Sequence, residues 1–134
     1  MKARILIVDD EPALRRTLER ALRNLEYDVV SVGDPHLAYE LLDSADYDLV
    51  MLDIHMPQMT GDTLAIALLR RWPQLVGRVL LMTGDPWARR ADWPAELHEC
   101  LLLLKPFTLD ALGSAVRSAL LAQAPKPQRK SNGG

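Results

Sequence analysis

Short apolar runs alternate along this chain with segments whose apolar residues recur at helical spacing. The apolar runs predict strands over residues 3–8, 28–32, 48–52, 78–82 and 100–104. Between these runs, apolar residues lie three or four positions apart, as Leu14, Leu18 and Leu22 do in the first such segment, and this spacing predicts helices. Strands that alternate with helices predict a parallel sheet whose strands are joined by right-handed crossovers.

Most of the predicted strands are apolar at nearly every position, as expected when helices cover both faces of a sheet. The order of elements favours an α/β fold of the flavodoxin-like kind, a doubly wound five-stranded parallel sheet with strand order 2-1-3-4-5. Residues 84–99 break the pattern because they contain Pro86 and Pro94. We therefore expect the fourth helix to be irregular or shortened.

The chain has 134 residues, of which 49% are hydrophobic, so one domain with a substantial core is expected. We expect residues 1–122 to form this domain and the largely polar residues 123–134 to form a flexible C-terminal tail. A formal net charge of -2 does not favour direct binding to nucleic acid.

The expected location is the cytoplasm. No apolar stretch approaches the ~18 residues that cross a membrane, so no membrane insertion is expected. The first two residues lead straight into the first predicted strand, without a signal peptide. The single cysteine, Cys100, allows no disulfide within the chain, which suits a reducing compartment.

Acidic side chains and a lysine follow the ends of three predicted strands. Asp9 and Asp10 follow the first strand and Asp53 follows the third. Lys105 follows the fifth strand, and Thr83 follows the fourth. The carboxyl ends of parallel strands meet at one edge of the sheet, and the switch point between strands one and three forms a crevice there. We therefore expect these side chains to share one site.

The chemistry that suits such a site is phosphorylation of an aspartate with a bound metal. Mg²⁺ prefers oxygen ligands and takes one or two protein carboxylates, and a carboxylate can act as a nucleophile to form an acyl phosphate. Mg²⁺ and Lys105 would neutralise the phosphoryl charge, and the Thr83 hydroxyl would donate to a phosphoryl oxygen. Each residue also has a simpler interpretation, as a helix cap, a loop residue or a turn, but four strand ends rarely carry this set by chance.

Several motifs around these residues resemble the receiver domains of two-component response regulators, the CheY-like superfamily. The motifs are Val8-Asp9-Asp10-Glu11, Leu52-Asp53-Ile54-His55-Met56-Pro57 with Gly61, Met82-Thr83-Gly84 and Lys105-Pro106-Phe107. The resemblance extends from Lys2 to about Ala122. It implies a phosphoprotein that acts as a signalling switch or as a relay in phosphorelay signal transduction, and that catalyses only its own phosphorylation and dephosphorylation.

The resemblance also implies a role for each site residue. Asp53 would be the phosphoacceptor, and Thr83 and Lys105 would bind the phosphoryl group. The implied Mg²⁺ ligands are Asp9, Asp10, Asp53 and the backbone carbonyl of His55. The Lys105–Pro106 peptide would be cis. The implied partner is a sensor histidine kinase or a histidine phosphotransfer protein, and phosphorylation would be compatible with a homodimer.

Two features depart from the family pattern. Leu102 occupies a position where an aromatic residue usually takes part in the switch, and the segment from Trp87 to His98 lacks the usual regular helix. We expect Trp87 and Trp93 to cover the core where the helix is broken. We also expect the response to phosphorylation to concentrate in residues 84–99, with Trp87 as its reporter.

Two other functions compete with the receiver interpretation. A phosphatase of the haloacid dehalogenase type has a second aspartate two residues after its nucleophile, and here that position is His55. A flavodoxin binds its flavin phosphate in a loop after the first strand, where the acidic residues 9–11 would repel it. For a receiver, three arrangements stay open: a stand-alone regulator, a relay intermediate, or one domain of a larger protein.

Overall fold

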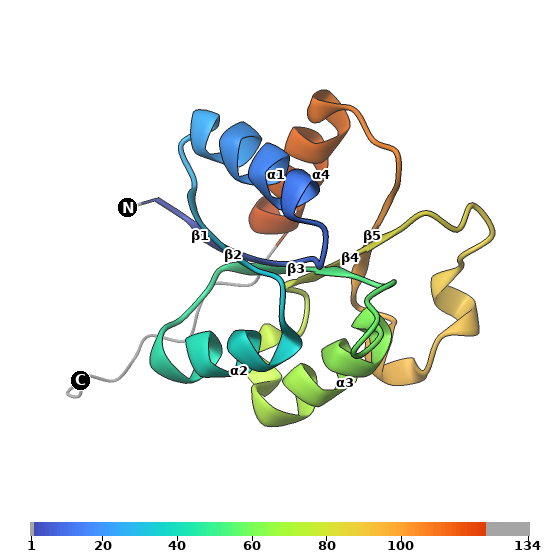
Figure 1. Ribbon diagram of the computed structural model, residues 1–134. Helices are drawn as coiled ribbons and strands as arrows, with labels where there is room; N and C mark the ends of the chain where they lie inside the picture. Colours follow the sequence, from blue (N-terminus) through green and yellow to red (C-terminus); the bar gives the residue numbers. More distant parts are fainter. Residues whose placement is uncertain (1, 123–134) are drawn as a thin grey trace.

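The five strands form one parallel sheet in the order β2-β1-β3-β4-β5, seen in a computed structural model that describes residues 2–122 (Figure 1). The strands are β1 (Arg4–Val8), β2 (Asp28–Val32), β3 (Leu49–Asp53), β4 (Val79–Thr83) and β5 (Leu101–Leu104). Their bounds agree with the prediction to within one residue. The predicted fold class and strand order are confirmed. The predicted tail, residues 123–134, lies outside the described residues.

Helices cover both faces of the sheet. They are α1 (Pro12–Asn24), α2 (Pro35–Ser44), α3 (Gly61–Arg71) and α4 (Leu109–Leu121). Helices α1 and α4 lie on one face, and α2 and α3 lie on the other (Figure 1). Alternate residues of a strand point to opposite faces, so Ile5 and Ile7 join the core below α1 and α4, whereas Leu6 and Val8 join the core of the other face.

Prolines and short polar side chains mark where the helices begin. Pro12 and Pro35 occupy the first turns of α1 and α2, where the missing N–H costs nothing. The Asp34 carboxylate accepts the N–H of His36 at 2.9 Å, and Thr108 caps α4 in the same manner. After α3, Pro73 begins the 3-10 turn η1 (Pro73–Leu75).

Two 3-10 turns, η2 (Arg90–Asp92) and η3 (Ala95–Leu97), connect β4 to β5 where a regular α-helix was unlikely on sequence grounds. The irregular or shortened helix predicted within residues 84–99 is therefore confirmed. Leu97 and Cys100 are buried and close the core of the α2 and α3 face in place of a helix.

The two tryptophans of this connection differ in environment. Trp93 packs against the core on the α2 and α3 face, as expected. The expectation for Trp87 was wrong, because its side chain is 79% exposed. Its backbone N–H donates to the Asp85 carboxylate at 2.9 Å, and this tight turn just beyond β4 leaves the indole without a core to cover.

Candidate functional site

The strand ends bring the three predicted acids together. Val8 and Leu52 are paired in the sheet, so Asp9, just after β1, and Asp53, the last residue of β3, lie at the same level. Asp9, Asp10 and Asp53 each contribute a carboxylate oxygen to a group whose members all lie within 4.8 Å of one another. Asp9 and Asp53 are buried and Asp10 is half-buried, so the group is most accessible from the side of Asp10.

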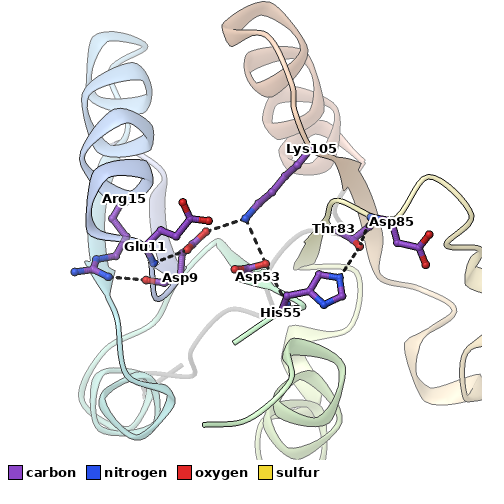
Figure 2. A network of polar contacts seen from close by, with 8 residues as sticks. All are labelled: Asp9, Glu11, Arg15, Asp53, His55, Thr83, Asp85 and Lys105. Atoms are coloured by element: carbon purple, nitrogen blue, oxygen red, sulfur yellow. Dashed lines mark hydrogen bonds and ion pairs between the residues drawn. The ribbon is translucent and has the colours of Figure 1, made fainter. Parts of the chain in front are cut away.

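Lys105, just after β5, extends its side chain between Asp9 and Asp53 and contacts both (Figure 2). Its Nζ lies 3.3 Å from Asp9 Oδ2 and 3.3 Å from Asp53 Oδ1. The Lys105 backbone N–H continues the sheet by donating to the Thr83 carbonyl at 2.7 Å, and the Lys105–Pro106 peptide is cis. The ammonium is therefore held against both buried carboxylates.

Asp9 is the most deeply buried of the acids, at 0% exposure. Burial raises its pKa above the ordinary value of 3.8. The Glu11 N–H, which donates to Asp9 Oδ1 at 2.9 Å, and the charge of Lys105 lower the pKa, whereas Asp53 raises it. Burial outweighs the effects that lower the pKa, so the Asp9 pKa stays raised. A further positive charge beside Asp9 would favour its ionised form.

The backbone around Asp53 is tightly packed. Asp53 Oδ1 accepts the N–H of His55 at 3.1 Å. Gly61, at the start of α3, lies directly against the Asp53 carbonyl, and a Cβ there would come within 2.8 Å of the Ile54 Cα. The motif glycine is thus required by close approach of two backbones, and it stands where the loop after β3 ends and α3 begins.

Thr83 is 1% exposed and ends β4 beside the crevice. Its Oγ1 accepts the N–H of Asp85 at 3.1 Å and lies 3.3 Å from His55 Nε2 (Figure 2). Sequence reasoning considered His55 for its backbone carbonyl and did not anticipate this contact of its ring. It also missed Arg15, whose guanidinium donates to the Asp9 carbonyl at 2.6 Å. No sequence pattern signals either contact.

The chemistry of the donor set suits Mg²⁺. The three clustered acids offer only oxygen ligands, which a hard cation prefers. One lysine faces two buried carboxylates, and like charges at this separation repel one another. A divalent cation would supply the positive charge that the side chains leave uncompensated.

Replacing Asp9 with asparagine is expected to stabilise the metal-free protein at neutral pH. The Asp9 pKa is raised in the folded state. The stability that protonated Asp9 contributes is therefore present below pH 3.8 and is lost as the pH rises through the folded-state pKa. An amide does not ionise and has no such loss. The gain of Asp9→Asn in thermal midpoint, measured in a chelator, should therefore grow as the pH is raised from about 4 to 7. A gain that shrinks with rising pH would contradict this.

The comparison with protein families now decides the class of this domain. A family model described as the response regulator receiver domain matches residues 5–117. The chain belongs to the response regulator receiver domain family. Receiver domains function in two-component signalling, and membership gives the haloacid dehalogenase alternative no support. Membership likewise gives the flavin-binding alternative no support, and the term flavodoxin-like describes only the fold.

Individual relatives agree with this receiver assignment. The transcriptional regulatory protein TcrA of Mycobacterium tuberculosis is 34% identical over 127 residues, which cover 93% of this chain and 48% of TcrA. The sensor protein EvgS of Escherichia coli is 34% identical over 111 residues, which cover 83% of this chain and 9% of EvgS. The receiver domain therefore spans less than half the length of either relative.

A solved structure is similar over almost the whole described fold. The response regulator protein TrrA from Thermotoga maritima, in complex with Mg²⁺ and BeF, is 30% identical with a TM-score of 0.77, and the match covers 90% of this chain and 100% of that one. Within residues 2–122, no helix of the receiver domain is long and apolar enough to cross a membrane.

Proposed function

We propose that this receiver domain is phosphorylated on Asp53 in a Mg²⁺-dependent reaction and acts as a signalling switch or relay. The observation that carries the proposal is the position of Lys105. Its Nζ lies 3.3 Å from Asp9 and 3.3 Å from Asp53, and these two acids cluster with Asp10. This arrangement supplies a nucleophile, a cation and oxygen ligands in one crevice. The only reaction proposed for the domain is its own phosphorylation and dephosphorylation.

Asp10, Asp53 and the His55 backbone carbonyl would hold the Mg²⁺, with Asp9 close by. The bound ion would neutralise charge on the phosphoryl group. In the transfer, a carboxylate oxygen of Asp53 forms a bond to phosphorus while the bond from phosphorus to the donor breaks. Lys105 would bind a phosphoryl oxygen and neutralise part of its charge.

The donor that suits this chemistry is a phosphorylated histidine of a sensor histidine kinase or of a histidine phosphotransfer protein. An activated phosphoryl group needs no general base, because the transfer depends mainly on positioning and charge neutralisation. We also propose a cytoplasmic location, because the single cysteine, Cys100, suits a reducing compartment. A homodimer formed on phosphorylation is compatible with this proposal. EvgS is a sensor protein and TcrA is a transcriptional regulatory protein, so the kind of protein to which this receiver domain belongs stays open.

The proposed switch would act through the segment after β4. The Asp85 N–H donates to the Thr83 hydroxyl, and the Asp85 carboxylate accepts the backbone N–H of Trp87, so movement of the threonine would be passed through Asp85 to the Trp87 backbone. Leu102 is half-buried and packs against the core of the α2 and α3 face. The concentration of the response in residues 84–99 stays a prediction.

Uptake of phosphoryl groups tests the function without knowledge of the kinase. Acetyl phosphate is a small activated donor that requires no protein partner. The full chain incubated with acetyl phosphate and Mg²⁺ should gain the mass of a single phosphoryl group, and the same mixture with a chelator should show no gain. Uptake that is equal with and without the metal, or absent in both, would argue against the proposal.

Mg²⁺ binding should depend strongly on Asp10. Loss of a supporting residue around a metal site typically costs roughly 10–100-fold in affinity, and loss of a direct carboxylate ligand should cost at least as much. Asp10→Ala is therefore expected to weaken Mg²⁺ binding more than tenfold in calorimetric titration. Asp62→Ala is the matched control, since Asp62 lies at the start of α3 outside the clustered group. Equal affinities in the two variants would argue against this metal site.

A further inference from the structure

The side chain of His55 meets that of Thr83 at the edge of the crevice. His55 lies in the loop between β3 and α3, and its Nε2 is 3.3 Å from the Oγ1 of Thr83 at the end of β4. Figure 2 shows the imidazole ring turned toward the threonine, on the side of Asp53 away from Asp9. The contact links the two loops that border the proposed phosphorylation site.

The Thr83 hydroxyl is engaged by this contact. A hydroxyl has one proton and two lone pairs, and the Asp85 N–H already donates to its oxygen at 3.1 Å. If His55 Nε2 accepts, the hydroxyl proton is occupied; if Nε2 donates, the oxygen is held between two N–H groups. In the view of Figure 2 the ring lies between Thr83 and Asp53, so the threonine must give up its contact with the ring before its hydroxyl can reach a phosphoryl group on Asp53.

We propose that the His55 imidazole is a positioning residue that holds Thr83 in its unphosphorylated arrangement and so opposes capture of the phosphoryl group. The inference rests on the proposed function, in which Asp53 carries that group. His55 itself is exposed, so its ring is free to turn away once the contact breaks. The resting contact thus acts as a latch that phosphorylation releases.

The test uses beryllofluoride as a phosphoryl mimic, titrated calorimetrically into the full chain with saturating Mg²⁺. His55→Phe keeps a ring of similar size but has no nitrogen to contact Thr83. Because a hydrogen bond between side chains contributes only modestly, His55→Phe should bind beryllofluoride roughly two- to tenfold more tightly than the wild type. His55→Ala should tighten binding similarly. His36→Phe, on the exposed start of α2, should leave the affinity unchanged.

A double-mutant cycle separates the contact from other effects of the ring. In a Thr83→Ala background the contact is already absent, so His55→Phe should no longer change beryllofluoride affinity. Tighter binding by His55→Ala alone would assign the effect to ring bulk and overturn the inference, as would unchanged or weaker binding by His55→Phe. Failure of the wild type to bind beryllofluoride would instead overturn the proposed function together with the latch.

Discussion

Replacing Asp53 with asparagine is expected to abolish phosphoryl uptake from acetyl phosphate. An amide is a poor nucleophile, whereas a carboxylate can form the acyl phosphate. Asparagine has nearly the same shape, and its oxygen can still accept the His55 N–H that Asp53 Oδ1 accepts at 3.1 Å. The fold should therefore survive while the reaction stops, and intact mass spectrometry should find no phosphorylated species.

The control for this loss is a carboxylate outside the crevice. Asp43 is exposed on α2 and forms a surface ion pair with Arg71 at 3.4 Å. Asp43→Asn should take up phosphoryl groups as the wild type does. Uptake by Asp53→Asn at the wild-type level would mean that another residue is the acceptor.

Lys105→Met is expected to lower the free energy of unfolding by about 3 kcal/mol at neutral pH without Mg²⁺. Methionine keeps most of the apolar stem but leaves Asp9 and Asp53 facing each other without the ammonium that lies 3.3 Å from each. Both carboxylates are almost fully buried, and a buried charge that loses its partner is costly. Chemical denaturation of the metal-free protein measures this change.

The loss should shrink under conditions that remove the repulsion. Added Mg²⁺, a lower pH and the second substitution Asp9→Asn should each restore part of the stability, since each reduces the negative charge in the crevice. Arg71→Met removes a comparable cation from the exposed pair with Asp43 and should cost under about 1 kcal/mol. Equal losses of unfolding free energy in Lys105→Met and Arg71→Met would show that Lys105 does not compensate buried charge.

The gathering of the acids was predictable because it depends on a regular feature of the fold. A carboxylate that follows an apolar strand lies at the carboxyl edge of a parallel sheet, and neighbouring strands place Asp9 and Asp53 at the same level. Lys105 follows by the same rule at the end of β5. The prolines at positions 86 and 94 likewise excluded a regular helix before β5.

The contacts between loops were not predictable in this way. The ring of His55 reaches Thr83 because the loop after β3 turns toward β4, and that path is set partly by Gly61 against the Asp53 backbone. The exposure of Trp87 depends on a turn that begins at Asp85. A pattern of apolar and polar residues reports which face an element buries, but it does not report how an irregular segment is directed.

The position of the acyl phosphate tests the central proposal most directly. Borohydride reduces an acyl phosphate to an alcohol, so a phosphorylated aspartate becomes homoserine, which tandem mass spectrometry of peptides can locate. After treatment with acetyl phosphate and Mg²⁺, homoserine is expected at position 53 and at no other acid. Homoserine at Asp9 or Asp10 instead, or a phosphoryl group that survives reduction on another side chain, would contradict the assignment of Asp53 as the phosphoacceptor.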